Sequence, residues 1–260
     1  MLTRAHKDLT GRFPEVAAAA SALGDLVLDG ELCALRGDRL EFTGLRLGRP
    51  RREAEGVAVV LVLFDVLAAG RRDLRSAAYT TRRSELLRRL PAPRPYVQPI
   101  QNTLDEAEAE RRWFGLDIAR RGIEGYVRKP CRGIYGDPTA PWIKRRWRTT
   151  VDLVIAGATG DVAKPRGLVL GYRTPEGRVQ LSATSLPLAA PLRAALAGRL
   201  RPVGERTALP AARAGLPGRQ RELPYVPVEP EVEVEAEVDA AFELGRWRHG
   251  VKVLRVRDVS

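Results

Sequence analysis

The hydrophobic pattern in the first half of the chain predicts a mixture of strands and helices. Residues 57–67, VAVVLVLFDVL, form an almost continuous apolar run, which is typical of a central strand buried on both faces. Residues 26–35 are rich in strand formers, and Arg36-Gly37-Asp38 supplies a turn into a partner strand at 39–42. A further short strand is expected near Val97. Helices are predicted over 13–23, 84–90 and 103–121.

The longest of these predicted helices has signals at both ends. Thr103-Leu-Asp-Glu106 has the spacing of a capping box, and Gly122 is the expected stop. Beyond Thr150 the pattern changes to short strands separated by turn residues, with one helical segment near 191–200. The strands are predicted at 151–158, 167–173, 178–183, 231–238 and 251–256. This half of the chain is expected to form a small β-barrel, and the boundary is placed at Arg148.

The composition favours a polyanionic partner. The chain has a formal net charge of +12, and clustered Lys and Arg attract phosphates and release condensed counterions. An arginine-rich composition also accompanies a GC-rich genome, so charge alone does not select nucleic acid. Cys33 and Cys131 are far apart and lack CxxC spacing, which argues against zinc and disulfide scaffolds. With no apolar run of about 18 residues and no signal peptide, we expect a soluble cytoplasmic protein.

Several short motifs occur in a fixed order along the chain. Each is weak by itself, since a single glutamate or lysine in a strand is usually structural. They are Thr3-Arg4 with Asp8-Leu9-Thr10, LDGEL at 28–32, LFDVL at 63–67, EGYVRK at 124–129, WIKRR at 142–146 and RWRHGVKVLRVR at 246–257. In this order they resemble the covalent nucleotidyltransferases, and the FELGRWRH ending resembles the bacterial ATP-dependent DNA ligases.

The resemblance implies an α+β fold with two domains. Residues 1–148 would be part of a nucleotidyltransferase (adenylation) domain, and 149–260 an OB-fold β-barrel. It also implies ATP as adenylyl donor, Mg²⁺ or Mn²⁺ as metal, and nicked duplex DNA as substrate in repair or recombination. A monomer in the bacterial cytoplasm is expected, and the sequence identifies no protein partner.

The same resemblance assigns residues to the nucleotide. Glu31 would lie beside the ribose or a metal, and Phe64 would stack on adenine. An exposed strand glutamate and a plain core phenylalanine are the alternatives. Arg4 in the first motif, with Arg248 and Lys252 in the last, would complete the nucleotide contacts, although nonspecific DNA contact explains the C-terminal cations equally well. Arg255 and Arg257 belong to the same basic set.

Metal and phosphate contacts come from the later motifs. Glu124 matches the metal-binding glutamate, and Glu31 is a second candidate, because Mg²⁺ prefers one or two carboxylates with waters and phosphate oxygens. Lys129, Lys144 and Arg146 would surround the phosphates, with solvated surface charge as the alternative.

One charged residue can be singled out without the family. Asp65 lies inside the apolar run, and a buried carboxylate requires a hydrogen-bonded or charged partner. Three positions depart from the family pattern: His6 replaces a usual glycine, Arg146 a usual lysine and Gly250 a usual proline.

The nucleophile of the family is a lysine in a Lys-x-Asp-Gly motif before LDGEL. Lys7 has the wrong spacing, because the sequence there is Lys-Asp-Leu-Thr-Gly. The chain as written is therefore expected not to self-adenylylate, either because its true start lies upstream or because it is a degenerate ligase. A non-catalytic DNA-binding remnant is the alternative function, and an RNA ligase or capping-type enzyme fits the C-terminal motif less well.

Overall fold

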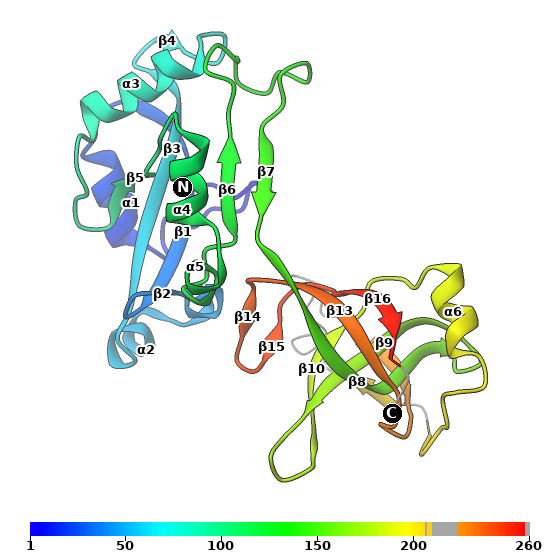
Figure 1. Cartoon of the computed structure of the whole chain (residues 1–260). Helices are drawn as coiled ribbons and strands as arrows, with labels where there is room; N and C mark the ends of the chain where they lie inside the picture. Colours follow the sequence, from blue (N-terminus) through cyan, green and yellow to red (C-terminus); the bar gives the residue numbers. More distant parts are fainter. Residues whose placement is uncertain (206, 210–222, 258–260) are drawn as a thin grey trace. The chain divides into compact units, whose positions relative to one another are not determined.

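The computed structural model describes residues 1–205, 207–209 and 223–257, and over these the chain divides into two compact units (Figure 1). The first unit is Met1–Arg145 and the second is Arg146–Ser260. The first combines helices with a sheet and the second is mostly strands, so the fold is α+β as the sequence predicts. None of the helices in the described ranges is long and apolar enough to cross a membrane.

The sheet of the first unit is built around the apolar run. Strand β3 (Val57–Ala69) pairs antiparallel with β1 (Leu26–Arg36), which in turn pairs with β2 (Arg39–Leu40). The short strand β4 (Arg72–Asp73) also pairs with β3, and β5 (Val97–Pro99) pairs with it in parallel. The predicted central strand is therefore confirmed, because β3 has neighbours along both edges.

Helices pack against this sheet, and the core of the unit lies between them. Helix α3 (Tyr79–Arg89) lies along β3 (Figure 1). Leu86 of α3 and Leu90 just after it share a buried cluster with Leu63 and Val66 of β3. Helix α1 (Pro14–Ser21) and α2 (Arg49–Ala54) also contact β3, and the 3₁₀ helix η1 (Phe42–Arg46) contacts β1. Burial of leucine side chains between helix and strand stabilises this half of the unit.

The predicted helix over 103–121 is wrong in two respects. It is split into α4 (Glu106–Trp113) and α5 (Leu116–Arg120), because Gly115 between them has a φ of 129°, which ends the helix. The capping residue is Asp105 rather than Thr103, since the Asp105 carboxylate accepts from the backbone N–H of Ala107 at 2.8 Å.

Strands β6 (Gly125–Arg128) and β7 (Ile143–Arg146) form a separate pair in the first unit. Glu110 of α4 holds both strands, because it accepts from the Tyr126 hydroxyl at 2.8 Å and lies 3.4 Å from the Arg145 guanidinium. The EGYVRK and WIKRR motifs are thereby placed side by side.

The second unit is a closed barrel. Strand β8 (Arg148–Asp161) pairs with β9 (Lys164–Arg173) and β13 (Glu233–Asp239), β9 pairs with β10 (Val179–Thr184), and β13 pairs with β16 (Lys252–Val256). A parallel bridge between Ser185 and Val251 joins the end of β10 to the start of β16. This bridge closes the ring of β8, β9, β10, β16 and β13 and gives the OB-fold barrel.

The barrel interior is filled by alternating apolar residues. Along β13, Val234, Ala236 and Val238 are buried while the glutamates between them are less buried, because successive side chains of a strand point to opposite faces. Leu196 of α6 (Ala190–Leu196) packs into the same core. Strands β11 (Thr207–Leu209) and β12 (Leu223–Pro227) extend the sheet from β8, and β14 (Phe242–Glu243) with β15 (Arg246–Trp247) forms a hairpin between β13 and β16.

Candidate active site

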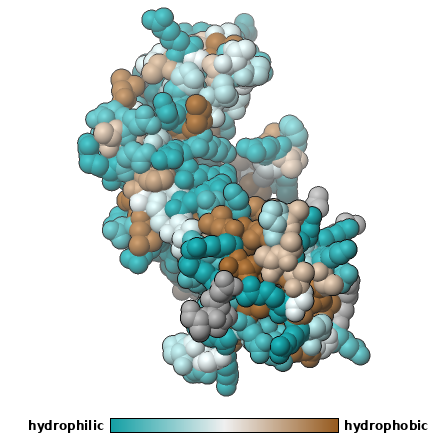
Figure 2. All heavy atoms as spheres, turned by 45° about the vertical axis from the view of Figure 1, so that its right-hand side comes forward, coloured by the Kyte–Doolittle hydropathy of each residue, from teal (hydrophilic) through white to brown (hydrophobic). Residues whose placement is uncertain are grey.

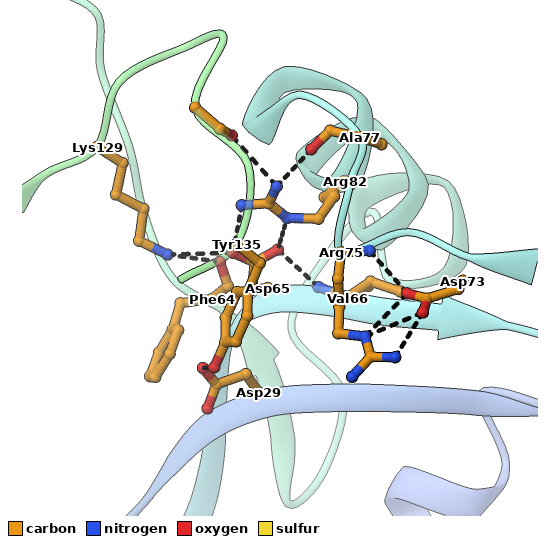
Figure 3. A network of polar contacts seen from close by, with 11 residues as sticks. Asp29, Phe64, Asp65, Val66, Asp73, Arg75, Ala77, Arg82, Lys129 and Tyr135 are labelled. Atoms are coloured by element: carbon orange, nitrogen blue, oxygen red, sulfur yellow. Dashed lines mark hydrogen bonds and ion pairs between the residues drawn. The ribbon is translucent and has the colours of Figure 1, made fainter. Parts of the chain in front are cut away.

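The first unit contains a buried ion pair at the LFDVL motif (Figure 3). The carboxylate of Asp65 on β3 lies 2.7 Å and 3.1 Å from two guanidinium nitrogens of Arg82 on α3, and both side chains are fully buried. The Val66 backbone N–H donates to the same carboxylate at 3.0 Å. The prediction that Asp65 requires a partner is confirmed, and two parallel hydrogen bonds fix the orientation of the carboxylate.

Lys129, at the end of the EGYVRK motif, joins this pair. Its Nζ donates to the Phe64 carbonyl oxygen at 3.1 Å and lies 3.7 Å from the Asp65 carboxylate. Three aromatic rings surround the ammonium, with their centroids 3.7 Å away for Trp142, 4.7 Å for Tyr79 and 4.9 Å for Phe64. Ring faces attract cations, so this aromatic cage holds the ammonium between β3 and the chain around β6 and β7.

Burial changes the acidity of Lys129. Its side chain is only 9% exposed, and removal from water lowers its pKa from 10.5 to about 8. The nearby Asp65 carboxylate acts in the opposite direction but does not offset the loss of hydration. Lys129 therefore changes charge close to neutral pH.

Tyr135 extends the network to β1. Its hydroxyl donates to the Asp29 carboxylate at 2.7 Å (Figure 3). Its ring lies edge-on to Trp142, with the ring centroids 5.7 Å apart. Burial, with the bond to Asp29 as a second cause, raises the pKa of Tyr135 to about 12. Tyr135 thus remains a hydrogen-bond donor at any physiological pH.

The two candidate metal-binding carboxylates lie on different segments of the first unit. Glu31 is exposed on β1 opposite Val62, and Glu124 is partly buried just before β6. Among the residues that the structure describes, no group of three His, Cys, Asp or Glu side chains is arranged to hold a metal ion. Mg²⁺ usually keeps several waters and is held by only one or two carboxylates together with phosphate oxygens.

The other cations assigned from the early and central motifs are exposed. Lys144 and Arg146 project from β7, and Arg4 lies in a tight turn near the N-terminus. The same turn contains His6, whose φ of 57° is in the left-handed region that favours glycine. The family's usual glycine at this position has a clear backbone reason.

The C-terminal cations of the second unit differ in their surroundings. Arg255 lies 2.6 Å from Glu235, and Arg257 lies 3.0 Å from Asp152, so both are in cross-strand ion pairs. Lys252 is exposed on β16 opposite Glu237. Arg248 is partly buried, with its Nε 3.9 Å from Glu243. Because their neighbouring carboxylates offset their charge, Arg255 and Arg257 attract a polyanion less than Lys252 does.

The buried network around Lys129, called the Lys129 site below, consists of Phe64, Asp65, Tyr79, Arg82, Lys129, Tyr135 and Trp142. The sequence assigns no role to four of these residues. These are Tyr79, Arg82, Tyr135 and Trp142. One signal was available for Arg82, which precedes Leu86 and Leu90 at helical spacing and therefore lies on the apolar stripe of α3. Trp142 begins the WIKRR motif, but its position against Lys129 depends on the pairing of β6 with β7.

The fold and this site define a nucleotidyltransferase-like domain followed by an OB-fold barrel. The model of the ATP dependent DNA ligase domain matches residues 1–146, and the chain therefore belongs to this family. The LFDVL, EGYVRK and WIKRR motifs all lie in the matched segment.

Bacterial relatives and a solved structure agree with this assignment. A probable DNA ligase of Streptomyces coelicolor is 34% identical over 190 residues, covering 67% of this chain and 37% of the relative. A probable DNA ligase of Beutenbergia cavernae is 35% identical over 190 residues, covering 68% and 36%. The chain thus spans little more than a third of the length of these curated relatives. A Lig E DNA ligase structure, 17% identical, shares the fold with a TM-score of 0.53 over 98% of this chain and 85% of that one.

Proposed function

We propose that this chain acts in ATP-dependent sealing of nicks in duplex DNA, joining 3′-hydroxyl and 5′-phosphate ends through adenylyl transfer. The observation that carries the proposal is the Lys129 site, in which Phe64, Asp65 and Lys129 from two ligase motifs meet within the family-matched segment. An aromatic ring and a cation next to each other suit a base and its phosphates.

Within this proposal each residue has a definite task. Phe64 stacks on adenine, and Lys129 holds a phosphate oxygen through its ammonium, which Asp65 and the aromatic rings position. Lys144 and Arg146, exposed on the adjacent strand β7, bind further phosphate oxygens. Arg4 contributes a cation from the N-terminal turn. Preorganised cations of this kind stabilise charge that develops during phosphoryl transfer without later reorganisation.

Glu124 and Glu31 are proposed as carboxylate ligands of Mg²⁺ or Mn²⁺. When bound, the metal would neutralise phosphate charge and orient the reacting groups. Glu124 directly precedes β6 (Gly125–Arg128), and Lys129 directly follows it. A single strand therefore connects the proposed metal ligand to the proposed phosphate contact.

The barrel is proposed to bind DNA. OB folds commonly bind oligonucleotides on one strand face and adjoining loops, and the chain carries a net charge of +12. Lys252 and Arg248, which the C-terminal motif assigns to the nucleotide with DNA contact as the alternative, are proposed as the DNA contacts of the barrel. We further propose a monomer acting in the bacterial cytoplasm, because the relatives are bacterial ligases.

Joining of a 5′-adenylylated nick tests the proposal, because this last step requires metal and positioning but no covalent enzyme intermediate. The full chain is incubated with adenylylated nicked duplex and Mg²⁺, and ligated product is measured by denaturing electrophoresis. Glu124→Ala is expected to abolish joining. The control is Glu176→Ala, which changes an exposed glutamate of the second unit.

The outcomes separate the two candidate functions. Joining by the parent chain and by Glu176→Ala, but not by Glu124→Ala, supports a ligase site. Undiminished joining by Glu124→Ala removes Glu124 from the site. DNA binding without joining by any of the three proteins favours a non-catalytic DNA-binding ligase remnant.

A further inference from the structure

The β14–β15 hairpin presents a leucine in an unfavourable backbone conformation. Leu244 and Gly245 form its two-residue loop, with φ values of 51° and 78°. Two positive φ values are typical of the tight hairpin turn in which Asn-Gly is preferred, because a bulky side chain disfavours the left-handed region. The Leu244 side chain is 74% exposed, so packing within the chain does not compensate for this conformation.

The hairpin that carries Leu244 is firmly braced at its base. Phe242 and Trp247 face each other across the strands with ring centroids 4.6 Å apart. The backbone N–H of Arg248 donates to the Ala241 carbonyl at 2.8 Å, which extends the ladder below the rings. Trp247 also packs against the barrel core. The exposed leucine is thus held on a fixed support and not on a loose loop.

The surroundings of the tip are suited to nucleic acid. The hairpin connects β13 to β16, the last two strands of the barrel, and this connection is one of the loops with which OB folds bind oligonucleotides. A side chain built on Gly245 would come within 4 Å of Tyr172 and Gln180, so the tip lies beside the strand face used for the same purpose. Arg246, opposite Glu243 in the hairpin, places a cation next to the tip.

Leu244 also differs from the other apolar residues on this unit. Figure 2 shows a mostly hydrophilic surface interrupted by patches of hydrophobic residues. Among the described residues of the second unit, the exposed large apolar side chains are Leu181, Leu186, Val203, Leu244 and Leu254, and Leu244 has the largest exposed fraction. Proteins that open base steps insert such apolar side chains between bases as wedges.

We infer that Leu244 is a wedge that inserts at the interrupted base step of nicked duplex DNA and so distinguishes a nick from intact duplex. The inference rests on the proposed function and adds a residue that selects the substrate. A nick lacks one backbone linkage, and a base step without that linkage costs less to open than a continuous one. The contact is apolar and displaces no counterions, so it leaves the salt dependence of binding unchanged.

The test uses Leu244→Asn in the full chain, because its two expected effects have opposite signs. Asparagine tolerates the left-handed conformation, so the melting temperature should rise by about 2–4 °C. Affinity for nicked duplex, measured by fluorescence anisotropy, should fall about tenfold, which corresponds to 1.4 kcal/mol. Affinity for the intact duplex of the same sequence should change little, and the salt slope should be the same as for the parent chain.

Two further variants serve as controls. Leu244→Met keeps an apolar side chain of similar volume and should retain the preference for the nick. Leu104→Asn removes another exposed leucine, 90% exposed in the first unit, and should leave binding unchanged. A 2-aminopurine base beside the nick should brighten with the parent chain and with Leu244→Met, but not with Leu244→Asn.

Failure of the Leu244 wedge and failure of the proposed function give different binding results. If the parent chain binds nicked duplex and Leu244→Asn binds it with the same affinity and the same nick preference, the wedge is wrong while the proposed function stands. If the parent chain binds neither duplex, the DNA-binding part of the proposed function is wrong and the wedge falls with it.

Discussion

Replacing Arg82 with methionine should strongly destabilise the first unit. Arg82 and Asp65 are both fully buried, and their side chains make two charge-assisted hydrogen bonds at 2.7 Å and 3.1 Å. Removal of one partner of such a pair leaves a charge in the interior without its counterion, which costs about 3–5 kcal/mol. Lys129, at 3.7 Å from the same carboxylate, remains as a partial counterion for Asp65. The expected cost is therefore near the lower end of that range.

The Arg82→Met variant also loses hydrogen bonds outside the ion pair. Arg82 also donates to the backbone carbonyl of Ala77 at 2.6 Å and of Gly133 at 3.3 Å, and these oxygens lose a partner in the variant. Arg88→Met is the matched control, because Arg88 is on the same helix and paired with Glu85, but is 61% exposed. An exposed pair contributes only about 0–1 kcal/mol.

Urea unfolding followed by tryptophan fluorescence measures both variants. With a slope of about 1–3 kcal/mol per molar urea, a loss of 3–5 kcal/mol lowers the midpoint of the first unit by roughly 1 M or more. The double variant Asp65→Leu with Arg82→Met should recover part of the loss, since apolar residues can replace a buried pair, although Lys129 then lacks the Asp65 carboxylate. The reasoning is refuted if Arg82→Met is no less stable than Arg88→Met.

Two other predictions concern charge. Lys129 is protonated below its pKa of about 8, so the ATP affinity of the parent chain should fall as the pH rises through about 8. The variant Lys129→Arg stays charged, so its ATP affinity should lose this pH dependence. A pH profile of ATP affinity that is the same for the variant and the parent chain would exclude a Lys129–phosphate contact. Lys252→Ala should reduce the slope of log affinity for DNA against log salt by about 1. Arg255→Ala should reduce it less, because Glu235 at 2.6 Å already offsets the Arg255 charge, and equal effects in a salt titration would contradict this distinction.

The sequence predicts elements well where one physical signal dominates. The continuous apolar run at 57–67 is found as β3, Val57–Ala69, because a run rich in β-branched residues is typical of a central strand. The helix over 103–121 shows the limit of local signals. Asp105 and Thr103 are both suitable caps, and Asp105 holds the position. Gly115 then ends the helix before the predicted stop at Gly122.

The candidate site is predicted only in part, for a similar reason. Motif order brings Phe64 and Lys129 into one hypothesis, and the apolar run singles out Asp65 as needing a partner. The partner, Arg82, lies on a different element, and its identity depends on how α3 packs on β3. The ion pair of Arg255 depends on strand register, which contains an irregularity between Glu235 and Ala236 that the sequence does not reveal.

The measurement that tests the central claim most directly is equilibrium binding of α-labelled ATP to the full chain and to Phe64→Ala. Stacking of a base on an aromatic ring contributes about 1–3 kcal/mol, so the substitution should weaken ATP binding by roughly 5- to 150-fold. Phe42→Ala, which alters another partly exposed phenylalanine of the first unit, should bind ATP as the parent chain does. Equal ATP affinity of Phe64→Ala and the parent chain would contradict the assignment of the Lys129 site as the nucleotide site.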